Sequence, residues 1–240
     1  MYYFFYIWLK TGIRIIEVGC NRMTKTPKVI TVIMFASLLK LFGCSGQSSQ
    51  DETRSQGNSL DAQISKSTED FKNRPIHRKL TSEIIDTTSD VNLLQTVFDN
   101  LTEKYARDDQ KEFQTVTSWN KPRQAIYIIW ALEAEVNNGG FNQFYFNSSG
   151  QYAGLVPEAL RLVGATKFAD LVTRANAVYE KEKEKIKKHQ DETLEGFSKS
   201  YQDNPLNKFD DEFYALYDEE NLQQLQIDFV RKNKQFFIDK

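Results

Sequence analysis

The fold of this chain is decided by the stretch Glu135-Val-Asn-Asn-Gly-Gly-Phe-Asn-Gln-Phe-Tyr-Phe-Asn147. An apolar run leads into it, two glycines interrupt it, and an aromatic segment that carries several amides follows. Polar side chains set among aromatic rings must form hydrogen bonds, because an unpaired buried amide costs roughly 1–3 kcal/mol. The stretch is therefore either an internally satisfied joint between two helices or a pocket for a polar ligand, and the sequence leaves both open.

The segment before the glycines predicts a central, buried helix. Asn120 is a good N-cap, and Pro122 suits the first turn, where no backbone donor is needed. Residues 125–136 are apolar nearly all round. Glu133 and Glu135 lie roughly 200° apart on such a helix, so at least one carboxylate faces the interior. That carboxylate needs hydrogen-bond donors or a cation, or its pKa rises.

The two glycines predict a break in this helix. Gly139 and Gly140 can take a left-handed conformation without penalty, so we expect the helix to end over residues 137–140. The residues that follow fit a second helix of two turns. Within it Gln143 and Asn147 are four residues apart and share a face.

Further helices are expected on both sides of the joint. A short helix over residues 80–85 and a longer one that starts near Ser89 precede it, while residues 155–163, closed by Gly164, and a long helix capped by Thr166 follow it. The expected core-facing stripes are Val91, Leu94, Phe98, Leu101 and Tyr105, then Phe168, Leu171, Val172, Ala175, Val178 and Tyr179, and then Phe209, Phe213, Leu216 and Tyr217.

The remaining segments complete an all-α fold. Residues 107–117 are expected to be a loop or a frayed helix end, residues 193–205 are expected to be a loop, and a closing helix begins near Leu222. No run of useful length has the period of a strand. We therefore expect a single compact helical domain of about six to eight helices over residues 75–240.

The amino terminus has the pattern of a secretory signal. Lys25 and Lys28 precede a short apolar run, and Leu41-Phe-Gly-Cys44 follows. This arrangement resembles the lipobox of bacterial lipoproteins, which implies that residues 1–44 form a leader and that Cys44 is lipidated. Met23 starts such a signal more naturally than Met1, so residues 1–22 are either a start site placed too early or a short membrane anchor.

Residues 45–74 are rich in polar side chains and are expected to form a disordered tether between the lipid and the domain. Ser45, directly after Cys44, favours the periplasmic side of the outer membrane. A cytoplasmic location is the alternative if the signal is not used.

Composition excludes several kinds of site from the expected mature chain. Its cysteines would be removed or lipidated, and only His77 and His189 remain, so we expect no disulfide framework, no metal site and no cofactor. The mature part would carry 25 basic and 32 acidic side chains, a net charge of −7, and residues 191–240 contribute −6 of it. Direct nucleic-acid binding is therefore not expected.

The central stretch supports a more specific comparison. Asn138-Gly-Gly-Phe-Asn-Gln-Phe-Tyr-Phe-Asn-Ser-Ser-Gly150, with Ala159-Leu160 and Val163-Gly-Ala165, resembles the domain of unknown function 4375, the C-terminal region of the DNA-mimic protein family. The resemblance covers residues 120–177 and implies an all-helical fold. The named member of that family is an acidic dimer that occupies a DNA-binding transcription factor in place of DNA. Mild acidity outside the last fifth of the chain and an envelope location count against the same role here.

Three functions remain open. The first is a non-catalytic binding module for an unknown, basic protein partner, with its contact surface either on the acidic helix 209–220 or at the joint. The joint residues proposed for binding are Glu135, Asn138, Gly139, Gly140, Phe141, Gln143 and Asn147. The second is a hydrolase-type enzyme in which Glu133 or Glu135 acts as general base beside the amides of the joint. The third is a DNA-mimic or immunity-type inhibitor.

The alternative to an enzymatic role is that the amides of the joint are purely structural. In that alternative Gln143 and Asn147 hydrogen-bond to the backbone that the glycines leave unpaired. No nucleophile–base pair, metal set or phosphate loop is recognisable in the sequence to support catalysis.

Overall fold

The computed structural model describes residues 65–105, 111–188 and 194–240. Within the described residues the chain divides into two compact units, residues 65–75 and Ile76–Lys240. The expected lipidation site Cys44 and most of the expected tether lie outside the described residues. No helix in the described part of the chain combines the length and apolar character needed to cross a membrane.

The described part of the first unit contains one helix, at residues 65–72. Arg74 closes it: Nη1 donates to the Phe71 carbonyl at 2.7 Å, and the guanidinium lies 3.5 Å from the centre of the Phe71 ring. This helix corrects the expectation of a disordered tether at these residues. No proline or glycine interrupts the segment, so polar composition alone did not prevent helix formation.

The described part of the second unit is all-α, as the sequence predicts, and contains nine α-helices. They are α4 (Ser82–Thr87), α5 (Asp90–Glu103), α6 (Glu112–Ser118), α7 (Lys121–Phe146), α8 (Val156–Val163), α9 (Thr166–Lys187), α10 (Leu194–Lys199), α11 (Asn207–Leu216) and α12 (Leu222–Lys232). There are also two short 3-10 helices, η2 (Ser148–Tyr152) between α7 and α8 and η3 (Lys234–Phe236) after α12. The number of α-helices exceeds the expected six to eight because α6 lies where a loop or a frayed helix end was expected and α10 lies where a loop was expected.

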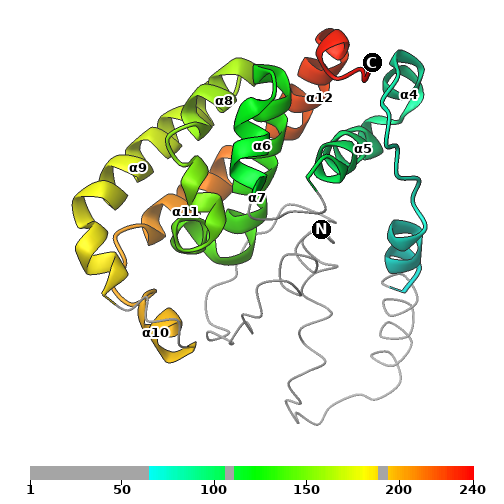
Figure 1. The fold of residues 1–240 in the computed structure, drawn as a ribbon. Helices are drawn as coiled ribbons and strands as arrows, with labels where there is room; N and C mark the ends of the chain where they lie inside the picture. Colours follow the sequence, from blue (N-terminus) through cyan, green and yellow to red (C-terminus); the bar gives the residue numbers. More distant parts are fainter. Residues whose placement is uncertain (1–64, 106–110, 189–193) are drawn as a thin grey trace, which may run out of the picture. The chain divides into compact units, whose positions relative to one another are not determined.

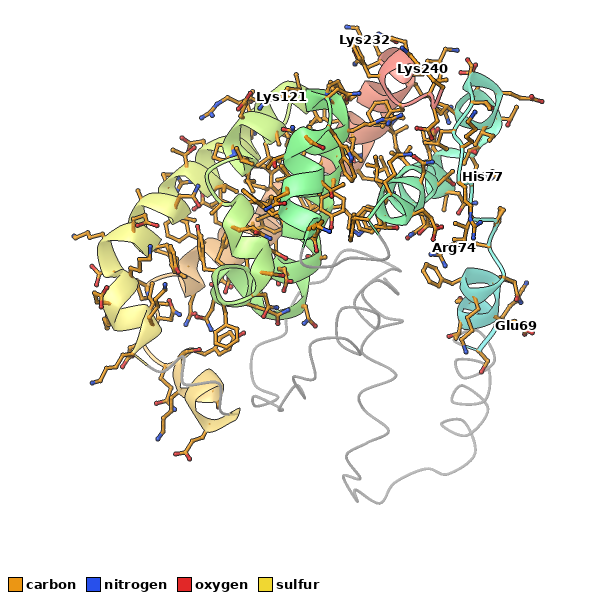
Figure 2. The ribbon with its side chains drawn as sticks, viewed as in Figure 1. Glu69, Arg74, His77, Lys121, Lys232 and Lys240 are labelled. Carbon is orange, nitrogen blue, oxygen red and sulfur yellow. The ribbon has the colours of Figure 1, made fainter. Side chains whose placement is uncertain are left out.

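Helix α7 is the centre of this unit, and α5, α6, α8 and α11 all pack against it (Figure 1). It begins as predicted: the Asn120 side chain accepts the Arg123 N–H at 3.0 Å, and Pro122 lies in the first turn. Residues 124–129 are all buried, and Trp130 stacks on Phe98 of α5 with ring centres 4.5 Å apart. Side chains fill the space between these helices (Figure 2).

The label α7 covers two helices that meet across a kink at the two glycines. Gly139 has φ −151° and ψ 27°, and Gly140 has φ 70° and ψ −174°, so neither residue is helical. The predicted break at the glycines and the second helix after it are therefore confirmed. Gly140 has the positive φ that glycine tolerates, but its ψ of −174° lies outside the left-handed helical region that the sequence predicts. The second part of α7 ends at Phe146, so Gln143 lies on it and Asn147 is its C-cap.

The carboxyl-terminal segment is fixed to the start of the unit by Asp239. Its backbone N–H donates to the Leu80 carbonyl at 2.9 Å, and its carboxylate accepts from the Leu80 N–H, Asn100, Lys104 and Arg123 at 2.8–3.0 Å. Burial would raise the pKa of Asp239, but the donors Leu80, Lys104 and Asn100 outweigh it and hold the pKa at about 2. These bonds hold the carboxyl-terminal segment against Leu80, the end of α5 and the start of α7.

Two further expectations were wrong. Val91 does not join the buried stripe of α5 but is 84% exposed, and Leu93 and Val97 are buried instead. Thr166 does not cap α9 with its side chain. The Glu220 carboxylate accepts the Lys167 and Phe168 N–H groups at 3.1 Å, so the cap comes from the segment after α11.

Candidate functional site

The joint places the Glu135 carboxylate in a cage of side-chain donors. Gln143 and Asn147 both donate to Oε2, at 2.7 and 2.8 Å, and the Ser149 hydroxyl donates to Oε1 at 3.1 Å. Glu135 is 3% exposed. Burial raises the pKa of this carboxyl, and the three donors act against that rise. The shared face predicted for Gln143 and Asn147 is thus confirmed, with one carboxylate oxygen binding both amides.

Two tyrosines donate to backbone carbonyls beside the bend. The Tyr214 hydroxyl of α11 donates to the Val136 carbonyl at 2.8 Å. The Tyr201 hydroxyl, from the turn after α10, donates to the Gly139 carbonyl at 2.9 Å. The side chains of Gln143 and Asn147, which the structural alternative assigned to the backbone at the glycines, donate to Glu135.

Asp210 of α11 completes the joint. Its Oδ1 accepts the Phe141 N–H at 2.7 Å, so it caps the second part of α7 from another helix. Its carboxylate occupies the space in which a side chain at Gly140 would begin: a Cβ there would lie 2.5 Å from the Asp210 Cγ. Burial raises the pKa of Asp210 to about 6; the Phe141 N–H opposes this rise and neighbouring Asp211 adds to it.

A second polar cluster lies on the other side of the bend. Asn142, which is fully buried, donates to the Ser200 hydroxyl at 2.7 Å and accepts from Asn204 at 2.9 Å. Asn204 also donates to the Ser200 carbonyl at 2.8 Å. These bonds fix the segment after α10 against α7.

The other candidate carboxylate, Glu133, is likewise turned inward. It accepts from the Tyr217 hydroxyl at 2.7 Å and from the Gln226 amide at 2.9 Å. Burial raises its pKa, and these two donors act against the rise. The amide oxygen of Gln226, a residue 1% exposed, has no hydrogen-bond partner. Both glutamates therefore face protein donors, on opposite sides of α7.

The outward side of α11 is different. Asp211, Tyr214 and Asp218 are exposed and spaced three and four residues apart, so they share a face, which we call the α11 face. The neighbouring acids are bound within the protein: Glu212 pairs with Arg174, Glu219 pairs with Lys167, and Glu220 caps α9. Within the described part of the chain, Asp211 and Asp218 form no ion pair.

Comparison with known proteins gives one match. Residues 117–233 match the family model of a DMP19-like protein. This is a family of DNA mimics, and the matched region includes α7 to α12 and hence the whole joint. No curated protein matches the chain, and neither does any solved structure. Membership in the domain of unknown function 4375 stays a prediction.

The DMP19-like region brings the predicted joint residues together but leaves them little access to solvent. Glu135, Gly140, Phe141 and Gln143 are buried, Gly139 and Asn147 are half-buried, and Asn138 is exposed. Asn138 donates to the Gln143 side-chain oxygen at 2.9 Å, so even the exposed amide is bound within the joint. Among the described residues, no group of three His, Cys, Asp or Glu side chains gathers as a metal site.

Sequence reasoning missed the residues that close the joint from a distance, namely Ser149, Ser200, Tyr201, Asn204, Asp210 and Tyr214. Asp210 in particular belongs to the acidic helix 209–220, which was expected to act as a contact surface, whereas its carboxylate turns toward α7. Most of these residues lie about sixty to seventy positions after their partners in the DMP19-like region, so no local spacing indicates the contacts.

Proposed function

We propose that this protein is a non-catalytic binding protein that engages a basic protein partner through the α11 face. The observation that carries the proposal is the contrast between the joint and this face. The polar groups of the joint are bound to one another, with both Glu135 oxygens held by protein donors. The carboxylates of Asp211 and Asp218, by contrast, remain available at the surface.

The α11 face has the chemistry to hold an arginine. Tyr214 is 43% exposed, while its hydroxyl is held by the Val136 carbonyl, so its ring is a fixed aromatic surface. A guanidinium can lie on such a ring and bind the flanking carboxylates of Asp211 and Asp218. The matched region carries 14 basic and 18 acidic side chains, a net charge of −4, which also favours a basic partner.

A DNA-mimic role is the second candidate, and the match to a family of DNA mimics favours it. It requires the protein to meet a DNA-binding protein, and therefore a cytoplasmic location. A lipid anchor on Cys44 would instead place the domain at the cell envelope, which is the location we propose from the leader sequence. The two candidates share the surface chemistry and differ in where the partner is found.

Labelling with palmitate separates these locations. Wild type is expected to incorporate the label and to fractionate with membranes, and Cys44→Ala is expected to do neither. Absence of label in wild type, with the protein in the cytoplasmic fraction, would reject the anchor and favour the DNA-mimic role.

A defined basic probe tests the α11 face in the full chain. An arginine-rich peptide of about ten residues is titrated at low salt into wild type and into the Asp211→Asn/Asp218→Asn variant. The variant is expected to bind about 3- to 10-fold more weakly, because each exposed charge pair is worth about 0.2–1 kcal/mol. A lysine peptide of equal length is expected to bind less well, since it cannot lie flat on Tyr214.

The matched control removes the same number of charges elsewhere. Glu184→Gln/Asp228→Asn neutralises two exposed acids on α9 and α12 and is expected to keep the wild-type affinity. If both double variants weaken the peptide equally, the attraction is a property of net charge, and the assignment of the α11 face is wrong.

A further inference from the structure

The bend in α7 is held by one ionisable group that can change its charge near neutral pH. Three side chains from residues 201–214 close the bend, namely Tyr201, Asp210 and Tyr214. The tyrosines donate neutral hydroxyls to carbonyls. Asp210 instead brings a carboxylate against Gly140, where it caps the second part of α7.

Among the described residues, no basic side chain contributes to the pKa of Asp210. On its own helix Asp210 faces Asp211 and Tyr214, and from the other packed elements it faces Tyr201. The basic side chains nearby are engaged elsewhere. Arg174 of α9 binds Glu212 and Asp170, and Lys208 lies over the Phe209 ring at 5.0 Å. An ionised Asp210 is therefore compensated only by the Phe141 N–H and by such water as reaches it.

We propose that Asp210 is a proton-linked latch, which stays docked on the bend of α7 when it carries a proton and tends to leave the bend when it is ionised. Leaving is geometrically simple, because the carboxylate occupies space that Gly140 leaves open and is held there by one backbone donor. The leaving carboxylate gains water, and the Phe141 N–H is then exposed to solvent as well.

The sign of the pH dependence follows from the two states of the side chain. In the docked state burial raises the pKa of Asp210 to about 6, above its ordinary value of 3.8. The docked state therefore binds the proton more tightly than the free state does. Docking is strongest below pH 4 and weakens as the pH rises through 6. A difference of about two pKa units corresponds to at most a ~100-fold change in the docking equilibrium, and partial access of water reduces this to about tenfold.

This latch also regulates the α11 face, a step that rests on the proposed function. Asp210 and the Tyr214 hydroxyl hold α11 on α7, while Asp211, Asp218 and the Tyr214 ring form the face. A cation brought to this side of α11 by a partner would favour ionised Asp210, so binding would release a proton. Peptide affinity is then expected to rise between pH 5 and pH 7.

The test compares the stability of the full-length wild type with that of Asp210→Asn between pH 4 and pH 7.5 by urea unfolding. Asn keeps the shape and the acceptor oxygen but cannot ionise. The folding equilibrium constant of wild type is expected to fall about 10- to 100-fold relative to that of Asp210→Asn across this range. Subtracting the variant removes the contributions of the two histidines and of the buried glutamates. Asp211→Asn changes an exposed neighbour, and its stability is expected to vary with pH in the same way as that of wild type.

If the stability of wild type and that of Asp210→Asn change with pH in the same way, the proposed latch is wrong. If Asp210→Asn does not fold, the carboxyl carbon of Asp210 is titrated by NMR in wild type. A midpoint near 6, with faster corrected exchange of the Phe141 amide above it, supports the latch, and a midpoint near 4 rejects it. These measurements need no partner, so a failed latch and a failed peptide-binding assignment are distinguishable.

Discussion

Replacing Gly140 with alanine should be among the most destabilising single-methyl additions in this protein. The residue has φ 70° and ψ −174°, a region essentially confined to glycine, so a side chain there costs about 1–3 kcal/mol in backbone strain. The new Cβ would also fall on the Asp210 carboxylate, with Cγ at 2.5 Å. Displacing Asp210 removes the cap on Phe141, worth about 1–2 kcal/mol.

The two contributions together predict that Gly140→Ala lowers the free energy of unfolding by about 2–5 kcal/mol. For a domain of this size this corresponds to a fall of roughly 5–15 °C in melting temperature. Urea unfolding and calorimetry of Gly140→Ala measure it. Gly154→Ala is the matched control, because a Cβ at Gly154 meets nothing within 4 Å and its φ is not positive. That control should stay within about 0.5 kcal/mol of wild type.

A double-mutant cycle separates strain from collision. If the methyl group displaces Asp210, then Gly140→Ala/Asp210→Ala should be less unstable than the sum of the single variants, by about 1 kcal/mol or more. If the stability losses of the two single variants simply add in the double variant, backbone strain alone explains the effect of Gly140→Ala. Gly140→Ala as stable as the Gly154→Ala control would refute both parts of the reasoning.

Four further substitutions test the joint, the contacts of Asp239 and a surface ion-pair cluster. Glu135→Ala leaves three donors without an acceptor, two of them buried, and should lower stability by about 3 kcal/mol in thermal unfolding. Asn147→Ala removes one donor and should cost about 1–2 kcal/mol. Because the pKa of Asp239 is lowered to about 2, its contribution of about 2 kcal/mol is complete above pH 3.8 and lost as the pH falls through 2. Asp239→Asn should therefore lose that slope in acid titration. Arg174→Ala breaks only exposed ion pairs, with Glu212 and Asp170, and should change stability by less than about 1 kcal/mol.

Local signals in the sequence are sufficient to predict the central element. An amide N-cap with proline in the first turn, a run of apolar residues and then two glycines predict where α7 starts, where it is buried and where it bends. The spacing of four residues also predicts that Gln143 and Asn147 share a face. Their hydrogen bonds to the same Glu135 oxygen confirm this. Each of these features depends on residues within a few positions of one another.

Features set by distant contacts could not be predicted in the same way. In α5, apolar residues allow more than one stripe, and packing against α7 and α12 buries Leu93 and Val97 while leaving Val91 exposed. Helix α6 buries only Val116, so no apolar period marks it in the sequence. The position of Asp210 depends on where α11 meets a bend sixty-nine residues earlier, which propensity does not encode.

The two adjacent glycines serve different purposes, and Gly139→Ala shows this. Gly139 has φ −151°, which does not require glycine. Its missing side chain instead makes room for the ends of two others, since a Cβ there would collide with the Gln143 Oε1 and lie 2.7 Å from the Tyr201 hydroxyl oxygen.

A long side chain can move its end more cheaply than a backbone can change its φ. Gly139→Ala should therefore cost about 1–2 kcal/mol, through the Tyr201 bond to the Gly139 carbonyl, and clearly less than Gly140→Ala. Tyr201→Phe in the Gly139→Ala background should add little, because that bond is already lost. Equal losses at Gly139 and Gly140 in urea unfolding would mean that crowding, and not the positive φ, makes glycine necessary at the bend.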